Sequence, residues 1–193
     1  MAQIYLISPE NIPNISIFLA QLEEIFSINA QYCKPALFQL RLKNVSQSDI
    51  KEAIVAIKPI CEKYQVSMVL NDDISLALEY GIGLHVGSSD ANLQDLELFK
   101  QKSTQITGVS CYNSVERARI FGRVADYVSF GAIFPSLTKK KAQICEKSTI
   151  IEFCNESDVK VAIIGGISSE NIYEISDILD CVDYICVLSD VWN

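Results

Sequence analysis

The sequence predicts an α/β protein, a compact closed (β/α)8 barrel whose last helix is missing or reduced. Eight short runs rich in β-branched and aromatic residues alternate with stretches of helical character. The runs are almost continuously apolar, as in Val161–Ile164, which is typical of parallel strands covered on both faces. Eight such units in 193 residues approach the lower size limit of this barrel. We therefore expect one domain over residues 1–193, with a doubly wound open sheet as the alternative.

Strands and helices are expected to alternate along the whole chain. The expected strands are Gln3–Ser8, Ala36–Leu42, Ser67–Asn71, Gly83–Val86, Ile106–Ser110, Tyr127–Phe134, Val161–Ile164 and Tyr184–Ser189. The expected helices are Ile15–Gln31, Gln47–Tyr64, Ile74–Glu79, Leu93–Lys102, Val115–Phe121, Thr149–Asn155 and Glu170–Leu179. The chain stops just after the eighth strand, so we expect the apolar backs of the first and last strands to be exposed. A second subunit, and so a homo-oligomer, is one way to cover them.

Composition and charge narrow the class of partner. The formal net charge of −8 argues against nucleic acid, which selects for Lys and Arg, but leaves phosphorylated small molecules open. Seven cysteines without C-x-x-C spacing and a single histidine favour reduced thiols over a disulfide framework or a zinc site. We see no signal peptide and no apolar run long enough to cross a membrane, and therefore expect a cytoplasmic protein.

Polar residues follow the second expected strand, where a barrel of this kind places its chemistry. The alternation of a strand puts Gln39, Arg41 and Lys43 on one side. Two cations and an amide on one strand face would be costly in an apolar layer, but they suit an anion at the barrel mouth. The alternative is a surface ion pair.

Carboxylates follow the third and fourth expected strands. Asp72 comes directly after an apolar strand, and Asp90 lies in the loop after the next strand. Mg²⁺ usually takes one or two carboxylates together with substrate phosphates, so this pair indicates a magnesium site. The alternative for Asp72 is a helix N-cap, which Asp73 could serve equally well.

The later strands are followed by residues suited to phosphate. Ser136, Thr138 and Lys139 follow the sixth strand without a helical pattern, which indicates a phosphate-closing loop. The glycine pair Gly165-Gly166 and Ser189 end the seventh and eighth strands, although a glycine pair also suits a tight turn.

No protein nucleophile is indicated by the sequence. The only histidine, His85, lies inside an apolar strand and is more readily read as a satisfied core or supporting residue than as a catalytic base. None of the cysteines has an activating base beside it in sequence.

In this order, the motifs resemble those of the thiamine phosphate synthase and thiazole tautomerase family, whose members are TIM barrels. The resemblance covers essentially the whole chain. It rests on Gln39-Leu40-Arg41-Leu42-Lys43, Leu70-Asn71-Asp72, His85-Val86-Gly87 with Asp90, Gly108-Val109-Ser110, and Phe130 to Lys139.

The resemblance implies a transferase that condenses hydroxymethylpyrimidine diphosphate with a thiazole phosphate and releases pyrophosphate. It implies that Asp72 and Asp90 hold Mg²⁺. It also implies that the catalytic residues are Arg41, Lys43, Ser110 and Lys139. The pyrimidine diphosphate would be bound by Gln39, Arg41, Lys43, Asn71, Ser110 and Lys139, and the thiazole phosphate by Ser136, Thr138, Gly166, Leu188 and Ser189.

The chain departs from the family pattern at several positions. Asp73 stands where Arg is frequent, Ser88-Ser89 replace Gln-Glu, Tyr112 replaces a His, and Asp190 replaces a small residue. Three alternatives remain open: a related barrel that binds thiamine precursors or phosphates without turnover, a thiazole tautomerase, and another phosphosugar barrel enzyme. The missing His at Tyr112 speaks against the tautomerase.

Overall fold

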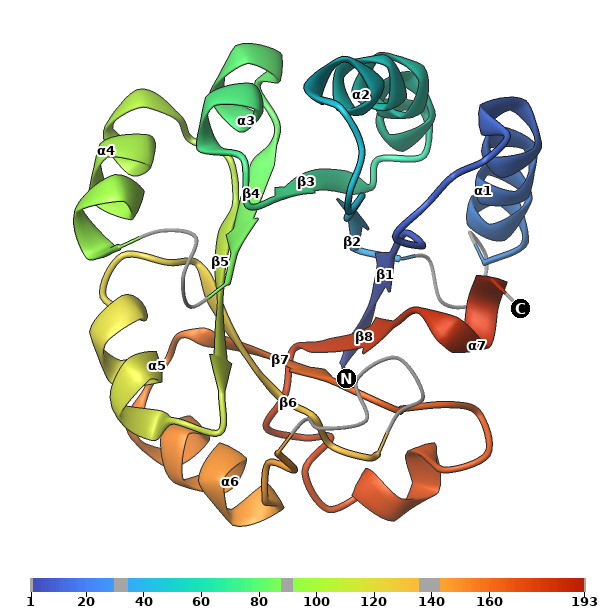
Figure 1. Cartoon of the computed structure of the whole chain (residues 1–193). Helices are drawn as coiled ribbons and strands as arrows, with labels where there is room; N and C mark the ends of the chain where they lie inside the picture. The colour runs from blue at the N-terminus through green and yellow to red at the C-terminus, as the bar shows by residue number, and fades with distance from the viewer. Residues whose placement is uncertain (1, 30–34, 88–91, 136–142, 193) are drawn as a thin grey trace.

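Eight parallel strands form a closed barrel in sequential order, as the sequence predicts (Figure 1). The computed structural model describes residues 2–29, 35–87, 92–135 and 143–192. The strands are β1 (Gln3–Ile7), β2 (Leu37–Leu40), β3 (Ser67–Asn71), β4 (Gly83–Val86), β5 (Thr107–Tyr112), β6 (Tyr127–Gly131), β7 (Lys160–Ile164) and β8 (Tyr184–Val187). Because β8 also pairs with β1, no strand is left as an edge.

Helices surround the barrel, and all but the last connect one strand to the next (Figure 1). They are α1 (Ile15–Asn29), α2 (Gln47–Lys63), α3 (Ile74–Tyr80), α4 (Leu93–Lys102), α5 (Val115–Phe121), α6 (Lys147–Glu156), the 3₁₀ helix η1 (Ile172–Ile175) and α7 (Ser189–Trp192). Five helices begin where a short polar side chain accepts a hydrogen bond from a first-turn N–H group, and these caps are Asn14, Ser46, Asp73, Asn92 and Ser114.

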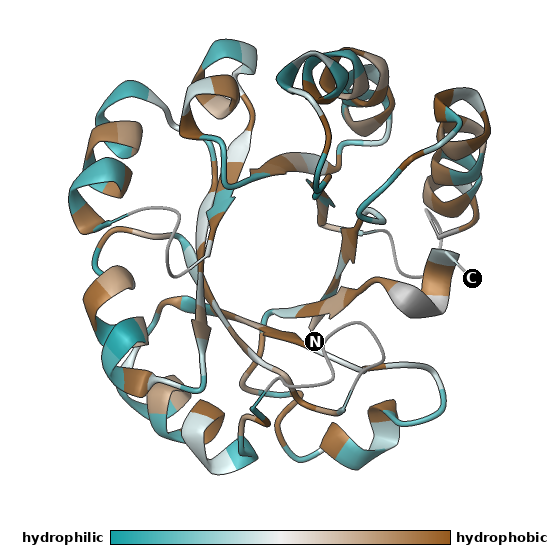
Figure 2. Ribbon diagram, viewed as in Figure 1, coloured by the Kyte–Doolittle hydropathy of each residue, from teal (hydrophilic) through white to brown (hydrophobic). Residues whose placement is uncertain are grey.

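The strands bury both faces, and alternate residues serve two separate cores. In β1, Leu6 faces the helices, whereas its neighbours Tyr5 and Ile7 face the barrel interior. In Figure 2 the strands are predominantly hydrophobic, while the helices carry both hydrophobic and hydrophilic surfaces. The interior core contains three tyrosines among smaller apolar residues: Tyr5, Ile7, Leu37, Val69, Tyr127, Ala162, Tyr184 and Cys186. It therefore combines apolar filling with phenol groups that need hydrogen-bond partners.

The expected helix Glu170–Leu179 is wrong, because only the four residues of η1 are helical there. Tight backbone hydrogen bonds to the third residue back recur along this segment, as from Asn171 to Ser168 and from Ile178 to Ile175. The Asn171 side chain bonds the Ser168 N–H and the Gly166 carbonyl and so favours a turn over an α-helix.

The expected strands at β1, β2, β6 and β8 extend beyond their observed ends. The clearest case is β6, which ends at Gly131 rather than Phe134. Beyond it, the Ile133 and Phe134 N–H groups bond the Ile164 and Gly165 carbonyls. This carries the chain over the end of β7.

The reduced last helix is present as α7, but the expected exposure of β1 and β8 is wrong. Their outward residues Leu6 and Ile185 are 1% and 5% exposed. Trp192 packs against Phe18 of α1 at a ring distance of 5.0 Å, and its indole N–H donates to the Ile7 carbonyl at 2.6 Å. The short C-terminal segment thus contacts both β1 and α1, and the reason for expecting a second subunit is removed.

In the part of the chain that the structure describes, no helix combines the length and apolar character needed to cross a membrane.

Candidate active site

Arg41 and Lys43 lie in the loop after β2, at the carboxyl end of the barrel. From the sequence, both residues are expected to continue the alternation of the second strand, which would place them on one side. That expectation is wrong, because β2 ends at Leu40. Beyond that point the Arg41 N–H donates to Ser8 Oγ at 2.8 Å and the Lys43 N–H to the Glu10 carbonyl at 2.9 Å. The chain has left the β2–β3 ladder and is held by the loop after β1. Both cations nevertheless lie at the predicted end of the barrel.

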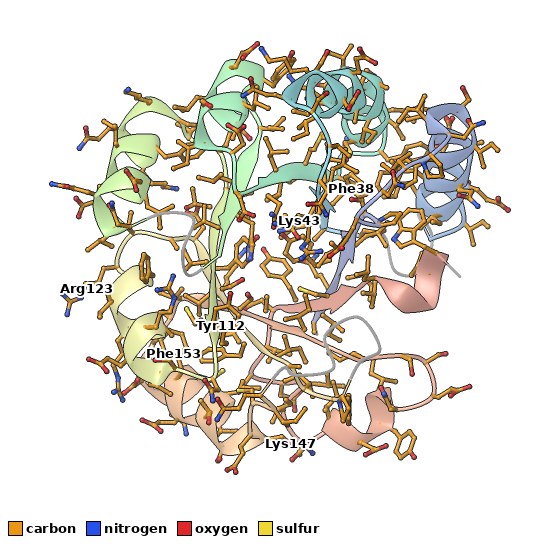
Figure 3. All side chains as sticks on the ribbon, viewed as in Figure 1. Phe38, Lys43, Tyr112, Arg123, Lys147 and Phe153 are labelled. Atoms are coloured by element: carbon orange, nitrogen blue, oxygen red, sulfur yellow. The ribbon has the colours of Figure 1, made fainter. Side chains whose placement is uncertain are left out.

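Lys43 and Asp72 form an ion pair that joins the loops after β2 and β3. Lys43 Nζ lies 2.8 Å from Asp72 Oδ2, and the Asn71 amide donates to the same oxygen. Both side chains of the pair are partly exposed, at 36% and 24%. Figure 3 shows Lys43 within the ring of strands, so the pair lies over the barrel opening. Three residues predicted to bind one substrate or its metal are therefore brought together.

The backbone and hydrogen bonds of Asp72 hold its carboxylate between the loops after β2 and β4. Asp72 has a left-handed backbone with φ of 68°, a conformation that Asp and Asn adopt more readily than other side chains. Its N–H donates to the His85 carbonyl at 2.8 Å, and its Oδ1 accepts from the Gly87 N–H at 3.3 Å. Asp72 is thereby fixed between β3 and β4. The neighbouring Asp73 is the N-cap of α3, a role that the sequence allowed for either carboxylate.

The donor set at the barrel opening suits a metal that shares its ligands with a substrate. Asp72 supplies one carboxylate, while Asp90, its predicted companion, lies outside the described residues. Among the described residues no group of three or more His, Cys, Asp or Glu side chains could hold a metal ion. A protein cage is thus absent from this part of the chain, whereas one carboxylate beside phosphate oxygens is the usual mode for Mg²⁺.

Arg41 is paired with a carboxylate that the sequence reasoning missed. Its guanidinium forms an ion pair with Glu10, in the loop after β1, and the Arg41 side chain is 18% exposed. Glu10 stands in no motif of its own, and the pairing of β1 with β2 brings it to Arg41. The pair places Arg41 at the same end of the barrel as Lys43, with its charge partly neutralised.

Gln39 and Ser110, two predicted substrate-binding residues, are joined by hydrogen bonds through the barrel interior. The Gln39 amide donates to Tyr5 Oη at 3.1 Å, and Tyr5 Oη lies 2.7 Å from Tyr127 Oη. Tyr127 Oη lies 2.9 Å from His85 Nδ1, and His85 Nε2 lies 2.9 Å from Ser110 Oγ. We call these five residues the interior chain. No sequence motif indicated that Tyr5 and Tyr127 take part in it.

His85 is satisfied on both ring nitrogens, which agrees with its predicted role as a supporting residue. Burial lowers the pKa of His85 to about 4, and nearby Asp72 opposes that shift only in part, while Arg41 adds to it. Burial also raises the pKa of Tyr5 and of Tyr127 well above the ordinary value. At neutral pH these three side chains are therefore uncharged and act as hydrogen-bonding groups.

Ser110 is also held through its backbone. The Arg117 guanidinium donates to the Ser110 carbonyl at 2.9 Å and to the Gly87 carbonyl at 3.4 Å, and it lies over the Phe121 ring. The register of β5 against β6 shifts between Ser110 and Tyr112, and Tyr112 has φ of 56°. Tyr112 is 43% exposed beside this strand end (Figure 3). Arg117 was not expected at the site, since it lies on a helix with no motif around it.

The ends of β7 and β8 carry the predicted residues Gly166 and Leu188. Gly166 has φ of 64°, and a Cβ there would lie 2.8 Å from the Pro135 carbonyl oxygen and 2.9 Å from Phe134. The close approach that this glycine permits is therefore made by the chain following β6. Leu188 is partly buried against the interior core. Ser189 begins α7, but its side chain is outside the described part of the structure.

Several predicted residues lie in segments outside the described residues. They are Asp90, with its neighbours Ser88 and Ser89, and the loop residues Ser136, Thr138 and Lys139.

Comparisons with known proteins agree with the resemblance noted in the sequence. The sequence model of the family described as thiamine monophosphate synthase matches residues 4–191. The thiamine-phosphate synthase of Pelagibacter ubique is 30% identical over 194 residues, covering 98% of this chain and 88% of that protein. The thiamine-phosphate synthase of Aromatoleum aromaticum is 34% identical over 193 residues, with the same coverage of both chains.

Solved structures share the fold. Thiamine phosphate pyrophosphorylase from Pyrococcus furiosus matches with a TM-score of 0.76 at 22% identity, covering 97% of this chain and 85% of that one. The 3-hexulose-6-phosphate synthase from Salmonella typhimurium matches with a TM-score of 0.67 at 15% identity, covering 97% of this chain and 90% of that one. Because enzymes with different names share it, the barrel alone does not select a reaction.

Proposed function

This chain belongs to the thiamine monophosphate synthase family, and we propose that it condenses hydroxymethylpyrimidine diphosphate with a thiazole phosphate to give thiamine phosphate and pyrophosphate. The observation that carries this proposal is the grouping of Lys43, Asn71 and Asp72 at the barrel opening, in the positions where the family's motifs stand. Similarity along nearly the whole chain to two thiamine-phosphate synthases supports the same reaction.

The reaction that we propose needs charge neutralisation rather than a protein nucleophile. Departure of the diphosphate leaves a pyrimidine-methyl cation, and the thiazole nitrogen captures it. Lys43 and Arg41 would accept the diphosphate oxygens and stabilise the charge that develops on the leaving group. Their present partners Asp72 and Glu10 keep both cations at the barrel opening before substrate arrives. Buried cysteines such as Cys111 agree with a reaction that uses no protein nucleophile. Burial raises the pKa of the Cys111 thiol to about 12, so the thiol stays protonated at neutral pH.

We propose Mg²⁺ as the cofactor, held by Asp72 and Asp90 together with the diphosphate. Bound there, the ion would neutralise phosphate charge and orient the leaving group. The partly exposed Asp72 carboxylate, fixed between Lys43 and the Gly87 N–H, supports this assignment. Lys43 and Asn71 already contact the carboxylate, so they would lie beside the diphosphate that it helps to bind.

The remaining substrate contacts are proposals that follow the order of the strands. Gln39 and Ser110 would orient the pyrimidine diphosphate from β2 and β5, and Lys139 would also bind it. The thiazole phosphate would bind at the ends of β6, β7 and β8, through the residues Ser136, Thr138, Gly166, Leu188 and Ser189. This arrangement holds the two substrates side by side across the barrel opening, which is what a condensation requires.

We also propose a cytoplasmic location, where both phosphorylated substrates would be available. The described cysteines support it, because Cys61, Cys111, Cys145, Cys154, Cys181 and Cys186 are all free thiols.

Pyrophosphate release from the purified protein tests the function directly. We expect release only when both substrates and Mg²⁺ are present, and its loss on addition of EDTA. Tight binding of both substrates with no release, by folded protein, would instead support a barrel that binds thiamine precursors without turnover. Conversion of the thiazole phosphate alone would support the tautomerase.

A further inference from the structure

The geometry of the interior chain points to Tyr127, with Tyr5 behind it, as a positioning residue that fixes Ser110 as a hydrogen-bond donor toward the substrate. The inference rests on the proposed function for the identity of the substrate. The direction of the hydrogen bonds is inferred step by step, starting from the Gln39 amide as donor to Tyr5 Oη.

A count of hydrogens sets the direction of the chain. Tyr5 Oη has two hydrogen-bond partners among the described residues, Gln39 Nε2 and Tyr127 Oη. Because the Gln39 amide donates, the single Tyr5 proton is the one directed to Tyr127. Tyr127 in turn has its own proton left for His85 Nδ1. All the donors therefore point the same way, from β2 through β1 and β6 to β4.

This direction selects one tautomer of His85. A neutral imidazole carries one N–H, and its other nitrogen accepts. Since Nδ1 accepts from Tyr127, the proton is on Nε2 and is donated to Ser110 Oγ at 2.9 Å. Ser110 Oγ then accepts the hydrogen bond that His85 donates from the barrel interior. Its own hydroxyl proton is directed away from His85 and is available to an acceptor at the barrel opening, such as a phosphate oxygen.

The barrel is built to hold the Tyr127 ring in this place. Gly108 lies beneath the ring, and a Cβ there would come within 1.9 Å of Tyr127 Cζ. The ring meets Tyr5 edge to face at 5.7 Å and stacks on His85 at 5.6 Å. Among the described residues no buried side-chain nitrogen or oxygen lacks a hydrogen-bond partner. The Tyr127 ring is thus fixed by packing on three sides, and its hydroxyl can form hydrogen bonds in only a narrow range of directions.

The substitution Tyr127→Phe tests the inference, because it removes the hydroxyl and keeps the ring. His85 is the only histidine in the chain, so selective ¹⁵N labelling of histidine gives one imidazole whose tautomer can be read directly by NMR. We expect the Nε2–H tautomer in the unaltered protein and a smaller Nε2–H population in Tyr127→Phe. We also expect kcat/KM to fall about tenfold, the effect of leaving one buried acceptor unpaired.

Tyr184→Phe is the matched control. Tyr184 packs edge to face on both Tyr5 and Tyr127, but its hydroxyl accepts from Lys160 at 3.2 Å and stands outside the interior chain. We expect the His85 tautomer and kcat/KM to match the unaltered protein. Thermal unfolding of all variants, followed by circular dichroism, checks that each one folds.

A double substitution separates positioning from general loss of structure. If Tyr127 acts through Ser110, adding Tyr127→Phe to Ser110→Ala lowers kcat/KM little further than Ser110→Ala alone. Full additivity would overturn the inference, as would an Nδ1–H tautomer in the unaltered protein or a Tyr184→Phe loss equal to that of Tyr127→Phe. The NMR measurement needs no turnover. Absence of pyrophosphate release would therefore count against the proposed function while the tautomer still decides the inference.

Discussion

Lys43 Nζ lies 2.8 Å from Asp72 Oδ2, and this ion pair links the ends of β2 and β3 at the opening of the barrel. Asp72 adopts φ of 68°, so its side chain and its backbone conformation are both part of the arrangement. A substitution at Asp72 can change the charge of the side chain, the strain of the backbone or both. The choice of replacement therefore decides which of the two effects an experiment measures.

Replacing Asp72 by Asn should remove the metal ligand with little effect on the fold. Asn tolerates the left-handed backbone and is close to Asp in size, whereas Ala at the same φ adds about 1–2 kcal/mol of strain. We expect Asp72→Asn to lower Mg²⁺-dependent pyrophosphate release by about a hundredfold or more. We expect Asp72→Ala to lose activity and to unfold at lower temperature. Near-normal release by Asp72→Asn would remove Asp72 from the metal site.

Lys139→Ala should weaken binding of the pyrimidine diphosphate more than binding of the thiazole phosphate. Loss of one charge-assisted contact to a phosphate corresponds to about a tenfold rise in KM for the diphosphate. Lys140→Ala is the matched control, since it removes the same charge from the adjacent position. Steady-state kinetics with each substrate varied in turn give both constants, and an equal rise in both would contradict the assignment of Lys139.

His85 should make the folded protein less stable as the pH falls from 6.5 to 4. Its pKa is about 4 in the fold, lowered by burial from the ordinary value of 6.5. The unfolded chain therefore binds the proton first, and unfolding is favoured increasingly across that window. The contribution of His85 to the free energy of unfolding is complete above pH 6.5 and is lost by pH 4. The loss is on the order of 3 kcal/mol.

His85→Gln isolates this effect, because Gln is neutral over the whole range. Urea unfolding at a series of pH values should give the variant a flatter slope than the unaltered protein between pH 6.5 and 4. All other titratable groups are common to both proteins, so only the difference between the two slopes belongs to His85. Parallel slopes would mean that His85 keeps its ordinary pKa in the fold.

Gly166→Ala should destabilise the protein through the chain that follows β6. A Cβ at this position lies 2.8 Å from the Pro135 carbonyl oxygen and is strained by φ of 64°. We expect a loss of about 1–3 kcal/mol in the free energy of unfolding. Gly81→Ala is the control, since Gly81 has φ of 60° with no atom within 4 Å of the added Cβ. A larger loss at Gly166 than at Gly81 measures the contact apart from the backbone strain, and equal losses would rule the contact out.

The sequence by itself determined the eight strands, their order and the positions where polar residues end them. Its apolar runs require burial on both faces, and only parallel strands covered by helices give that burial to each run in turn. Asp72 could be placed from the sequence because it follows such a run directly. Lys43 was assigned to the correct end of the barrel, although β2 ends at Leu40 and strand alternation does not reach it. The helix expected at Glu170–Leu179 failed, since side-chain bonds from Asn171 outweigh the helical spacing of the apolar residues.

Only the tertiary structure decided which polar groups meet. Tyr5 and Tyr127 read as ordinary core aromatics, and 122 positions of sequence separate the two hydroxyls that lie 2.7 Å apart. Glu10 and Arg117 belong to no motif, yet they bind Arg41 and the Ser110 carbonyl. Closure of the barrel brings the two tyrosines together. Pairing of β1 with β2 brings Glu10 to Arg41, and the turn from β5 into α5 brings Arg117 to the Ser110 carbonyl. Hydrogen bonds depend on distances of a few ångströms across the barrel, and the periodicity of a single chain segment carries no such distances.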